Sequence, residues 1–178
     1  MWAFDEHRLG LKPILRRQWA PEGRRPVAVG HPRHEWLYLY GFVHPGTGEV
    51  VWFVCTGVDA ELLRAVLAAF AAAVGAGEGK LVILALDNAG WHVSGDLVVP
   101  PGIELAFLPA YTPELQPAER LWPLANEAVA SKHFATLADL DAALSERCRT
   151  LAAMPDVIKA ETHFGWWPAA TPASQVAN

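Results

Sequence analysis

The feature that most constrains the fold is a run of six apolar residues, Leu-Val-Ile-Leu-Ala-Leu, at positions 81–86, which ends at Asp87 and Asn88. An uninterrupted apolar run of this length is typical of a β-strand that is buried on both faces between helices. We therefore expect residues 81–86 to form a central strand in an α/β protein, with Asp87 directly after it.

The segments around this run alternate between strand and helix patterns. Residues 36–43 are rich in aromatic side chains and residues 50–55 are apolar, and the turn at 44–48 between them predicts a hairpin. After Asp59, apolar side chains recur at helical spacing until Gly75, so these two residues are the expected N-cap and end of a helix. Further strands are expected at 2–4 and 103–108, a short strand near 27–29, and further helices from Pro117 and at 137–151. This order predicts a mixed central sheet flanked by helices.

Charge is distributed unevenly along the chain. The 178 residues carry a net charge of −5, but residues 1–35 carry +3 and the remaining residues −8. The global charge therefore does not indicate a nucleic-acid-binding protein, whereas the N-terminal segment could neutralise phosphates. The alternative is an ordinary solvated loop. The expected phosphate contacts are Arg16, Arg17, Arg24, Arg25 and Arg33.

Several classes of protein are excluded by the composition. The longest uncharged apolar stretch, residues 65–77, has 13 residues and is too short to span a bilayer. The N-terminus has neither the basic run nor the apolar segment of a signal peptide. Two cysteines, Cys55 and Cys148, cannot form a framework of disulfides. We therefore expect no membrane association and a reducing, cytoplasmic setting.

Three acidic residues lie where separate elements could bring them together. Asp5 follows the first expected strand, Asp87 follows the apolar run, and Glu119 opens the helix that begins at Pro117. Converging carboxylates repel one another unless a cation lies among them, and oxygen ligands favour Mg²⁺ or Mn²⁺. If the three carboxyl groups converge, they would form one metal site, and removal of Asp87 should then stabilise the metal-free fold. The alternative is that each acid is an ordinary turn or cap residue.

Three sequence blocks carry these acids. The first contains Phe4-Asp5-Glu6 and an Arg/Trp/Gly segment at 17–23, and the second is Leu-Asp-Asn-Ala-Gly-Trp-His at 86–92. The third is Pro-Ala-Tyr-Thr-Pro-Glu-Leu-Gln-Pro-Ala-Glu-Arg-Leu-Trp at 109–122. Together the blocks resemble DDE transposases, most closely the bacterial insertion-sequence branch of the Tc/mariner superfamily. The resemblance covers about residues 2–150.

This resemblance implies a ribonuclease H-like fold in which Asp5, Asp87 and Glu119 are the catalytic, metal-binding triad. It implies a metal-dependent endonuclease and strand transferase with two Mg²⁺ or Mn²⁺ ions, since two such ions can activate an attacking oxygen and stabilise a leaving oxygen. The implied partners are DNA, at element ends and at the target, a second copy of the chain, and a separate helix-turn-helix protein. The implied location is the bacterial cytoplasm, on the nucleoid when the protein is bound to DNA.

The chain departs from the pattern of these transposases in several places. Asn126 stands four residues after Trp122, where a Lys is common, and we interpret the change as the loss of a phosphate contact. Between Asp87 and Glu119 lie 31 residues, which is slightly short. We expect a catalytic domain at 1–165 and a disordered tail at 166–178, without an N-terminal helix-turn-helix domain. A fragment, a split-frame product and a decayed copy all fit this organisation.

Supporting roles around the triad are expected for Glu6, Asn88 and His92. Glu6 would point to the opposite face from Asp5 if the strand continues through both residues. Asn88 would brace its loop or orient Asp87, and Glu114 is an alternative third acid. Two alternative functions remain open. One is a ribonuclease H-like nuclease, and the other is a non-catalytic or repurposed remnant that binds nucleic acid or a protein partner.

Overall fold

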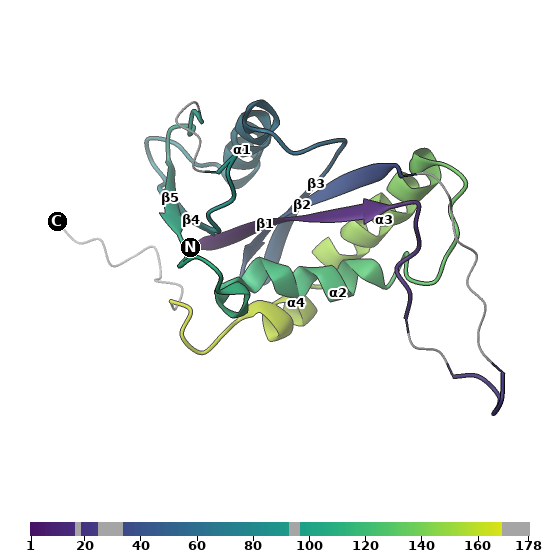
Figure 1. The fold of residues 1–178 in the computed structure, drawn as a ribbon. Coiled ribbons are helices and arrows are strands. Elements are labelled where there is room, and N and C mark those ends of the chain that lie inside the picture. Colours follow the sequence, from purple (N-terminus) through teal and green to yellow (C-terminus); the bar gives the residue numbers. More distant parts are fainter. Residues whose placement is uncertain (17–18, 25–33, 93–96, 169–178) are drawn as a thin grey trace.

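The protein forms one mixed sheet with helices on both faces. A computed structural model describes residues 1–16, 19–24, 34–92 and 97–168 (Figure 1). The expected strand near 27–29 and the end of the expected tail lie outside these residues. The strands of the sheet are β1 (Trp2–Gly10), β2 (Trp36–His44), β3 (Glu49–Cys55), β4 (Val82–Leu86) and β5 (Ile103–Phe107).

The order of the strands is β3-β2-β1-β4-β5. The β2–β3 hairpin is antiparallel, as predicted, and β2 is also antiparallel to β1. β4 is parallel to both β1 and β5. The predicted mixed sheet is therefore confirmed, and β1 lies at its centre, where the antiparallel and parallel halves meet.

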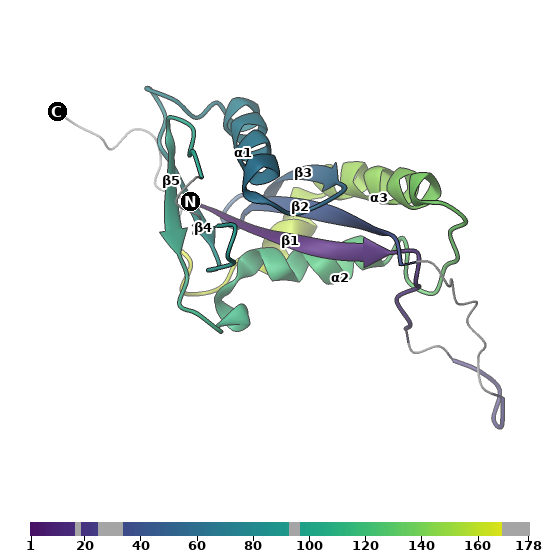
Figure 2. The same cartoon turned by 45° about the horizontal axis from the view of Figure 1, so that its top comes forward.

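Two helical layers cover the two faces of the sheet (Figure 2). Helix α1 (Ala60–Val74) buries its apolar side against Phe4, Phe42 and Leu84. The opposite face, which includes Ala3 and Leu39, is covered by the helices that follow β5. These helices are the 3-10 turns η1 (Pro113–Leu115) and η2 (Pro117–Arg120), then α2 (Leu121–Asn126), α3 (Leu137–Ala152) and α4 (Pro155–Thr162).

The helix boundaries follow signals in the sequence. Asp59 caps α1 by accepting a hydrogen bond from the backbone N–H of Leu62 at 2.8 Å. Gly75 ends the helix in the left-handed conformation, with φ at 68°, which glycine adopts without steric cost. Thr136 and Asp139 form a capping box at the start of α3. The helices predicted between Asp59 and Gly75 and at 137–151 are confirmed, whereas the chain from Pro117 forms the 3-10 turn η2 before α2 begins at Leu121. No helix in the described residues is long and apolar enough to cross a membrane.

Two expectations about the elements were wrong, and one helix was not predicted. β1 does not end at residue 4 but continues to Gly10, because its full length pairs with β2. Asp5 therefore lies inside a strand, just beyond the two residues that pair with β4. β4 is not buried on both faces, since Ile83 is 38% exposed. Helix α4, which begins at Pro155, was not predicted.

A glycine in β2 makes room for α2 against the centre of the sheet. Gly41 lies opposite Asp5 in the β1–β2 register. A Cβ atom at Gly41 would lie 2.9 Å from Cη2 of Trp122 and 3.1 Å from Cδ1 of Leu121. The Trp122 ring therefore occupies the space that any other side chain at position 41 would fill.

Replacing this glycine should destabilise the fold. We expect Gly41→Ala to lower the free energy of unfolding by about 1–3 kcal/mol, as overpacking of a core does. Gly57→Ala is the matched control, because a Cβ atom there meets nothing within 4 Å. Its effect should stay within about 0.5 kcal/mol. Urea unfolding of both variants measures the difference, and equal stabilities would contradict the close packing of Trp122 on Gly41.

Candidate active site

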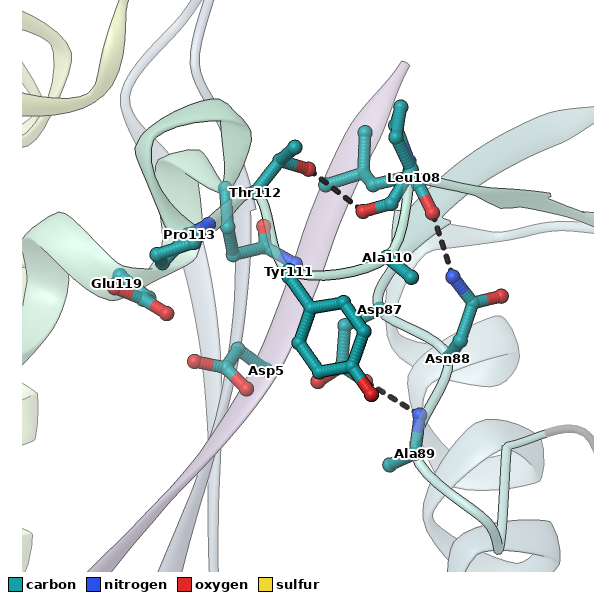
Figure 3. Close-up of a pocket in the computed structure, with 12 residues that line it drawn as sticks. Asp5, Asp87, Asn88, Ala89, Leu108, Ala110, Tyr111, Thr112, Pro113 and Glu119 are labelled. Carbon is teal, nitrogen blue, oxygen red and sulfur yellow. Dashed lines mark hydrogen bonds between the residues drawn. The ribbon is translucent and has the colours of Figure 1, made fainter.

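Asp5, Asp87 and Glu119 line one cavity of about 330 Å³ beyond the carboxyl end of β4 (Figure 3). Asp5 comes from the middle of β1, Asp87 directly follows β4, and Glu119 lies in the first turn of η2. The loop at 108–113, which leads from β5 to η1, forms another wall. The structure thus brings the three predicted acids to one place, as ligand sites of open α/β sheets usually are.

Asp5 is held by the indole of Trp122. Trp122 Nε1 donates a hydrogen bond to Asp5 Oδ2 at 3.0 Å. Burial raises the pKa of Asp5 to about 7, and the nearby charges of Glu6 and Asp87 add to the rise, although the bond from Trp122 opposes it. The buried carboxylate is therefore the acid that is least stable in its ionised form.

Glu119 is positioned through Gln116, which begins η2. The buried Gln116 side chain donates from Nε2 to the backbone oxygen of Phe4 at 2.9 Å and accepts a bond from the N–H of Ala118 at 3.3 Å. These two bonds attach η2 to β1 beside Asp5. Burial raises the pKa of Glu119, and the charge of Asp87 also raises it.

Asp87 is held by a hydrogen bond with His92. His92 Nδ1 lies 2.7 Å from Asp87 Oδ1, and His92 Nε2 lies 2.9 Å from Glu6 Oε1. Burial lowers the pKa of His92, but the hydrogen bonds to both carboxylates outweigh it and raise the pKa to about 9. His92 is therefore an imidazolium whose two N–H groups donate to two carboxylates.

This contact overturns the expectation about Asp87. The bond from His92, together with one from the N–H of Ala89 at 3.0 Å, lowers the pKa of Asp87. Interactions in the folded state therefore favour the Asp87 carboxylate, so its removal should not stabilise the metal-free fold. The acid whose charge is unfavourable in the folded state is Asp5 instead.

The other expected supporting residues also lie at the site. Glu6 points to the face opposite Asp5, where it accepts a hydrogen bond from Trp91 Nε1 at 3.1 Å as well as that from His92. Asn88 Nδ2 donates to the backbone oxygen of Leu108 at 2.7 Å and so joins the loops that follow β4 and β5. Glu114, the alternative third acid, does not line the cavity.

The arginines expected to contact phosphates lie away from this cavity or outside the described residues. Arg16 forms an ion pair with Glu127, and its guanidinium donates from Nη1 to Glu127 Oε2 at 2.6 Å. Arg24 is exposed in the loop after β1. Arg17, Arg25 and Arg33 lie outside the described residues.

The donor set suits a hard cation in chemical type, because it consists of carboxylate oxygens. The side chains themselves are not gathered as expected. Among residues 1–16, 19–24, 34–92 and 97–168, no three His, Cys, Asp or Glu side chains are close enough to hold one ion. The Asp87 carboxylate is drawn toward His92 and Ala89, and the like charges of the acids keep them apart.

Two contributions to the site had no signal in the sequence that marked them. The indole of Trp122 donates directly to the Asp5 carboxylate, and the amide of Gln116 makes two hydrogen bonds that place the turn carrying Glu119. Both residues belong to the third block, and their place in this block was the indication in the sequence that they lie near the site. Tyr111 of the same block lines the cavity with a positive φ of 61°, which side chains other than Gly rarely adopt.

A model of the DDE superfamily endonuclease family matches residues 1–141. The chain belongs to this family. The match covers all three acidic blocks, and the predicted resemblance to DDE transposases of the Tc/mariner type is confirmed.

Two curated proteins are similar to this chain in sequence. The chain is 40% identical over 87 residues to the uncharacterized protein y4pE/y4sA of Sinorhizobium fredii, which covers 49% of this chain and 63% of that protein. It is 27% identical over 140 residues to the insertion element IS630 uncharacterized 39 kDa protein of Shigella sonnei, covering 72% of this chain and 38% of that protein. The chain therefore spans less than two thirds of the length of either relative.

Solved structures of the Mos1 transposase share the fold. The Mos1 mariner paired end complex with Mn superposes with a TM-score of 0.61 and 17% identity, over 92% of this chain and 56% of that one. The Mos1 strand transfer complex gives a TM-score of 0.59 and 17% identity, over 92% and 55%. The predicted ribonuclease H-like fold is therefore confirmed.

The raised pKa of Asp5 predicts how the stability of the protein depends on pH. A folded-state pKa of about 7, above the ordinary 3.8, means that the wild type loses stability relative to Asp5→Asn as the pH rises from about 4 to 7. Above about pH 7 the difference should be constant, with the variant more stable by up to about 4 kcal/mol, since one pKa unit corresponds to about 1.4 kcal/mol. Urea unfolding in EDTA between pH 4 and 8 measures this difference.

The control for this titration is an acid on the exposed edge strand. Glu104→Gln removes one carboxylate from β5 and should shift the free energy of unfolding by no more than about 0.5 kcal/mol at any of these pH values. An Asp5→Asn variant that is less stable than the wild type at pH 8 would contradict the inference that the charge of Asp5 is unfavourable in the folded state.

Proposed function

We propose that this chain is the catalytic part of a DNA transposase that cuts and joins DNA strands with the help of divalent metal ions. The observation that carries the proposal is the shared cavity of Asp5, Asp87 and Glu119, three acids from three separate sequence blocks. Their arrangement at the end of β4 in a ribonuclease H-like fold supports a phosphodiester as the substrate.

The proposed reaction consists of two displacements at phosphorus. In the first, a water oxygen bonds to phosphorus and the P–O3′ bond breaks, which leaves a 3′-hydroxyl and a 5′-phosphate. In the second, that 3′-hydroxyl bonds to a phosphorus of the target strand, and the target's own 3′-oxygen leaves with a proton. Each displacement concentrates negative charge near the cavity, and this charge requires compensation.

Asp5, Asp87 and Glu119 would hold Mg²⁺ or Mn²⁺ in this reaction. When bound, such ions supply Lewis-acid activation of the attacking oxygen and neutralise charge on the leaving oxygen. His92 would keep the Asp87 carboxylate ionised and oriented, and Glu6 would hold His92 from the opposite side of β1. Asn88 would keep the loops after β4 and β5 together.

DNA is the proposed partner, in the form of element ends and target. Two of the solved neighbours are described as a strand transfer complex and as a paired-end complex with the left transposon end. A second copy of the chain and a separate helix-turn-helix protein are further proposed partners. The proposed catalytic domain is residues 1–165, and Arg16, Arg17, Arg24, Arg25 and Arg33 are proposed phosphate contacts.

Cleavage of DNA by the full chain tests this proposal. In Mn²⁺, we expect the wild type to nick supercoiled plasmid, and Asp87→Asn and Glu119→Gln each to slow the nicking by at least about a hundredfold, because even outer residues of metal sites cost 10–100-fold. Glu114→Gln is the matched control, since Glu114 lies five residues before Glu119 but does not line the cavity. Its rate should stay within about twofold of the wild type.

A second substrate separates the alternatives. A DNA–RNA hybrid that is cut in preference to plasmid would indicate a ribonuclease H-like nuclease instead of a transposase. Equal rates for the wild type and for Asp87→Asn would show that the cavity is not the active site. A wild type that binds Mn²⁺ or DNA but cuts neither substrate would indicate the non-catalytic remnant.

A further inference from the structure

The side of β1 that carries Asp5 faces α2, and two successive polar contacts join them. Residues two apart on a strand share a face, so His7 lies on the same side as Asp5. Residues four apart on a helix also share a face, so Trp122 and Asn126 of α2 point the same way. The two faces meet residue by residue, with Trp122 against Asp5 and Asn126 against His7.

In both polar contacts the donor and the acceptor can be assigned. Trp122 Nε1 donates to Asp5 Oδ2 at 3.0 Å. His7 Nε2 lies 3.0 Å from Asn126 Oδ1, and because that oxygen can only accept, the imidazole donates.

The His7 ring also packs flat on the indole that holds Asp5. The ring centroids of His7 and Trp122 lie 5.1 Å apart, and the planes are tilted by only 14°. Trp52 contacts the same indole at a centroid distance of 6.5 Å, and Gly41 leaves no spare room beside it. The indole is therefore confined, and its N–H is aimed at one oxygen of Asp5.

We propose that His7 and Asn126 are positioning residues for the active site, which hold the Trp122 indole so that Asp5 presents its other oxygen to the cavity. Asn126 orients the His7 ring by accepting its proton, the His7 ring fixes the plane of the indole, and the indole fixes the carboxylate. The effect of this role on catalysis rests on the proposed function, whereas the contacts themselves do not. Asn126 thus has a use in this chain that its interpretation as a lost phosphate contact did not include.

Variants of Asn126 and His7 separate positioning from simple packing. Asn126→Leu keeps the size of the side chain but removes the acceptor, whereas Asn126→Asp keeps an acceptor oxygen at the same reach. His7→Phe keeps the stacked ring but removes the donor, and it serves as a second test if Asn126→Leu does not fold. If His7 and Asn126 contributed only by packing, Asn126→Leu and His7→Phe would both retain that contribution.

Two measurements on the full chain provide the test. The first is hydrogen exchange of the Trp122 indole N–H by NMR in EDTA, with the resonance assigned by its loss in Trp122→Phe. We expect about three- to tenfold faster exchange in Asn126→Leu and His7→Phe, as loosening of one hydrogen bond predicts, and wild-type exchange in Asn126→Asp. The second is plasmid nicking in Mn²⁺, where we expect about tenfold lower kcat in the first two variants, an unchanged KM, and rescue in Asn126→Asp.

The outcomes distinguish failure of this proposal from failure of the proposed function. If the wild type does not nick plasmid, the exchange rates alone decide whether His7 and Asn126 hold the indole. Unchanged exchange in both Asn126→Leu and His7→Phe would overturn the proposal. Equal loss of activity in Asn126→Leu and Asn126→Asp, or a change in KM alone, would also overturn it.

Discussion

Asp5 places a largely buried carboxylate on the central strand of the sheet, and burial raises its pKa. Burying a charged group is costly unless it is hydrogen-bonded. Asp5 accepts a hydrogen bond from the backbone of Glu6, and the helical layer adds the indole of Trp122 as a second donor. Gly41 lets that indole reach the sheet, so one glycine and one tryptophan determine where α2 lies.

The position of α2 in turn places the third acid. Glu119 lies in η2, immediately before α2, and Gln116 attaches the start of η2 to the backbone of Phe4. Neighbouring residues of β1 therefore make their contacts on opposite faces of the sheet. Asp5 lies on the face of α2, whereas Glu6 reaches His92 on the opposite face, and His92 orients Asp87. A single strand therefore organises the whole cavity.

Elements with local signals could be predicted from the sequence. The caps at Asp59 and Gly75 determine the limits of α1, and the turn at 44–48 determines the β2–β3 hairpin. The length of β1 could not be predicted, because its second half alternates neither in hydropathy nor in charge. Asp5, Glu6 and His7 are polar, yet each finds a partner far away in the sequence. Such partners depend on tertiary contacts that periodicity does not reveal.

For the candidate site, the sequence blocks indicated the three acids that line the cavity, but not their hydrogen bonds. We propose that Asp5, Asp87 and Glu119 together bind divalent metal ions, and crystals of the wild type soaked with Mn²⁺ would test this binding. Anomalous diffraction should show manganese in the cavity, in contact with all three carboxylates, after small rotations of their side chains. Manganese bound only outside this cavity, or held there without Asp5, would show that the three acids do not form one metal site.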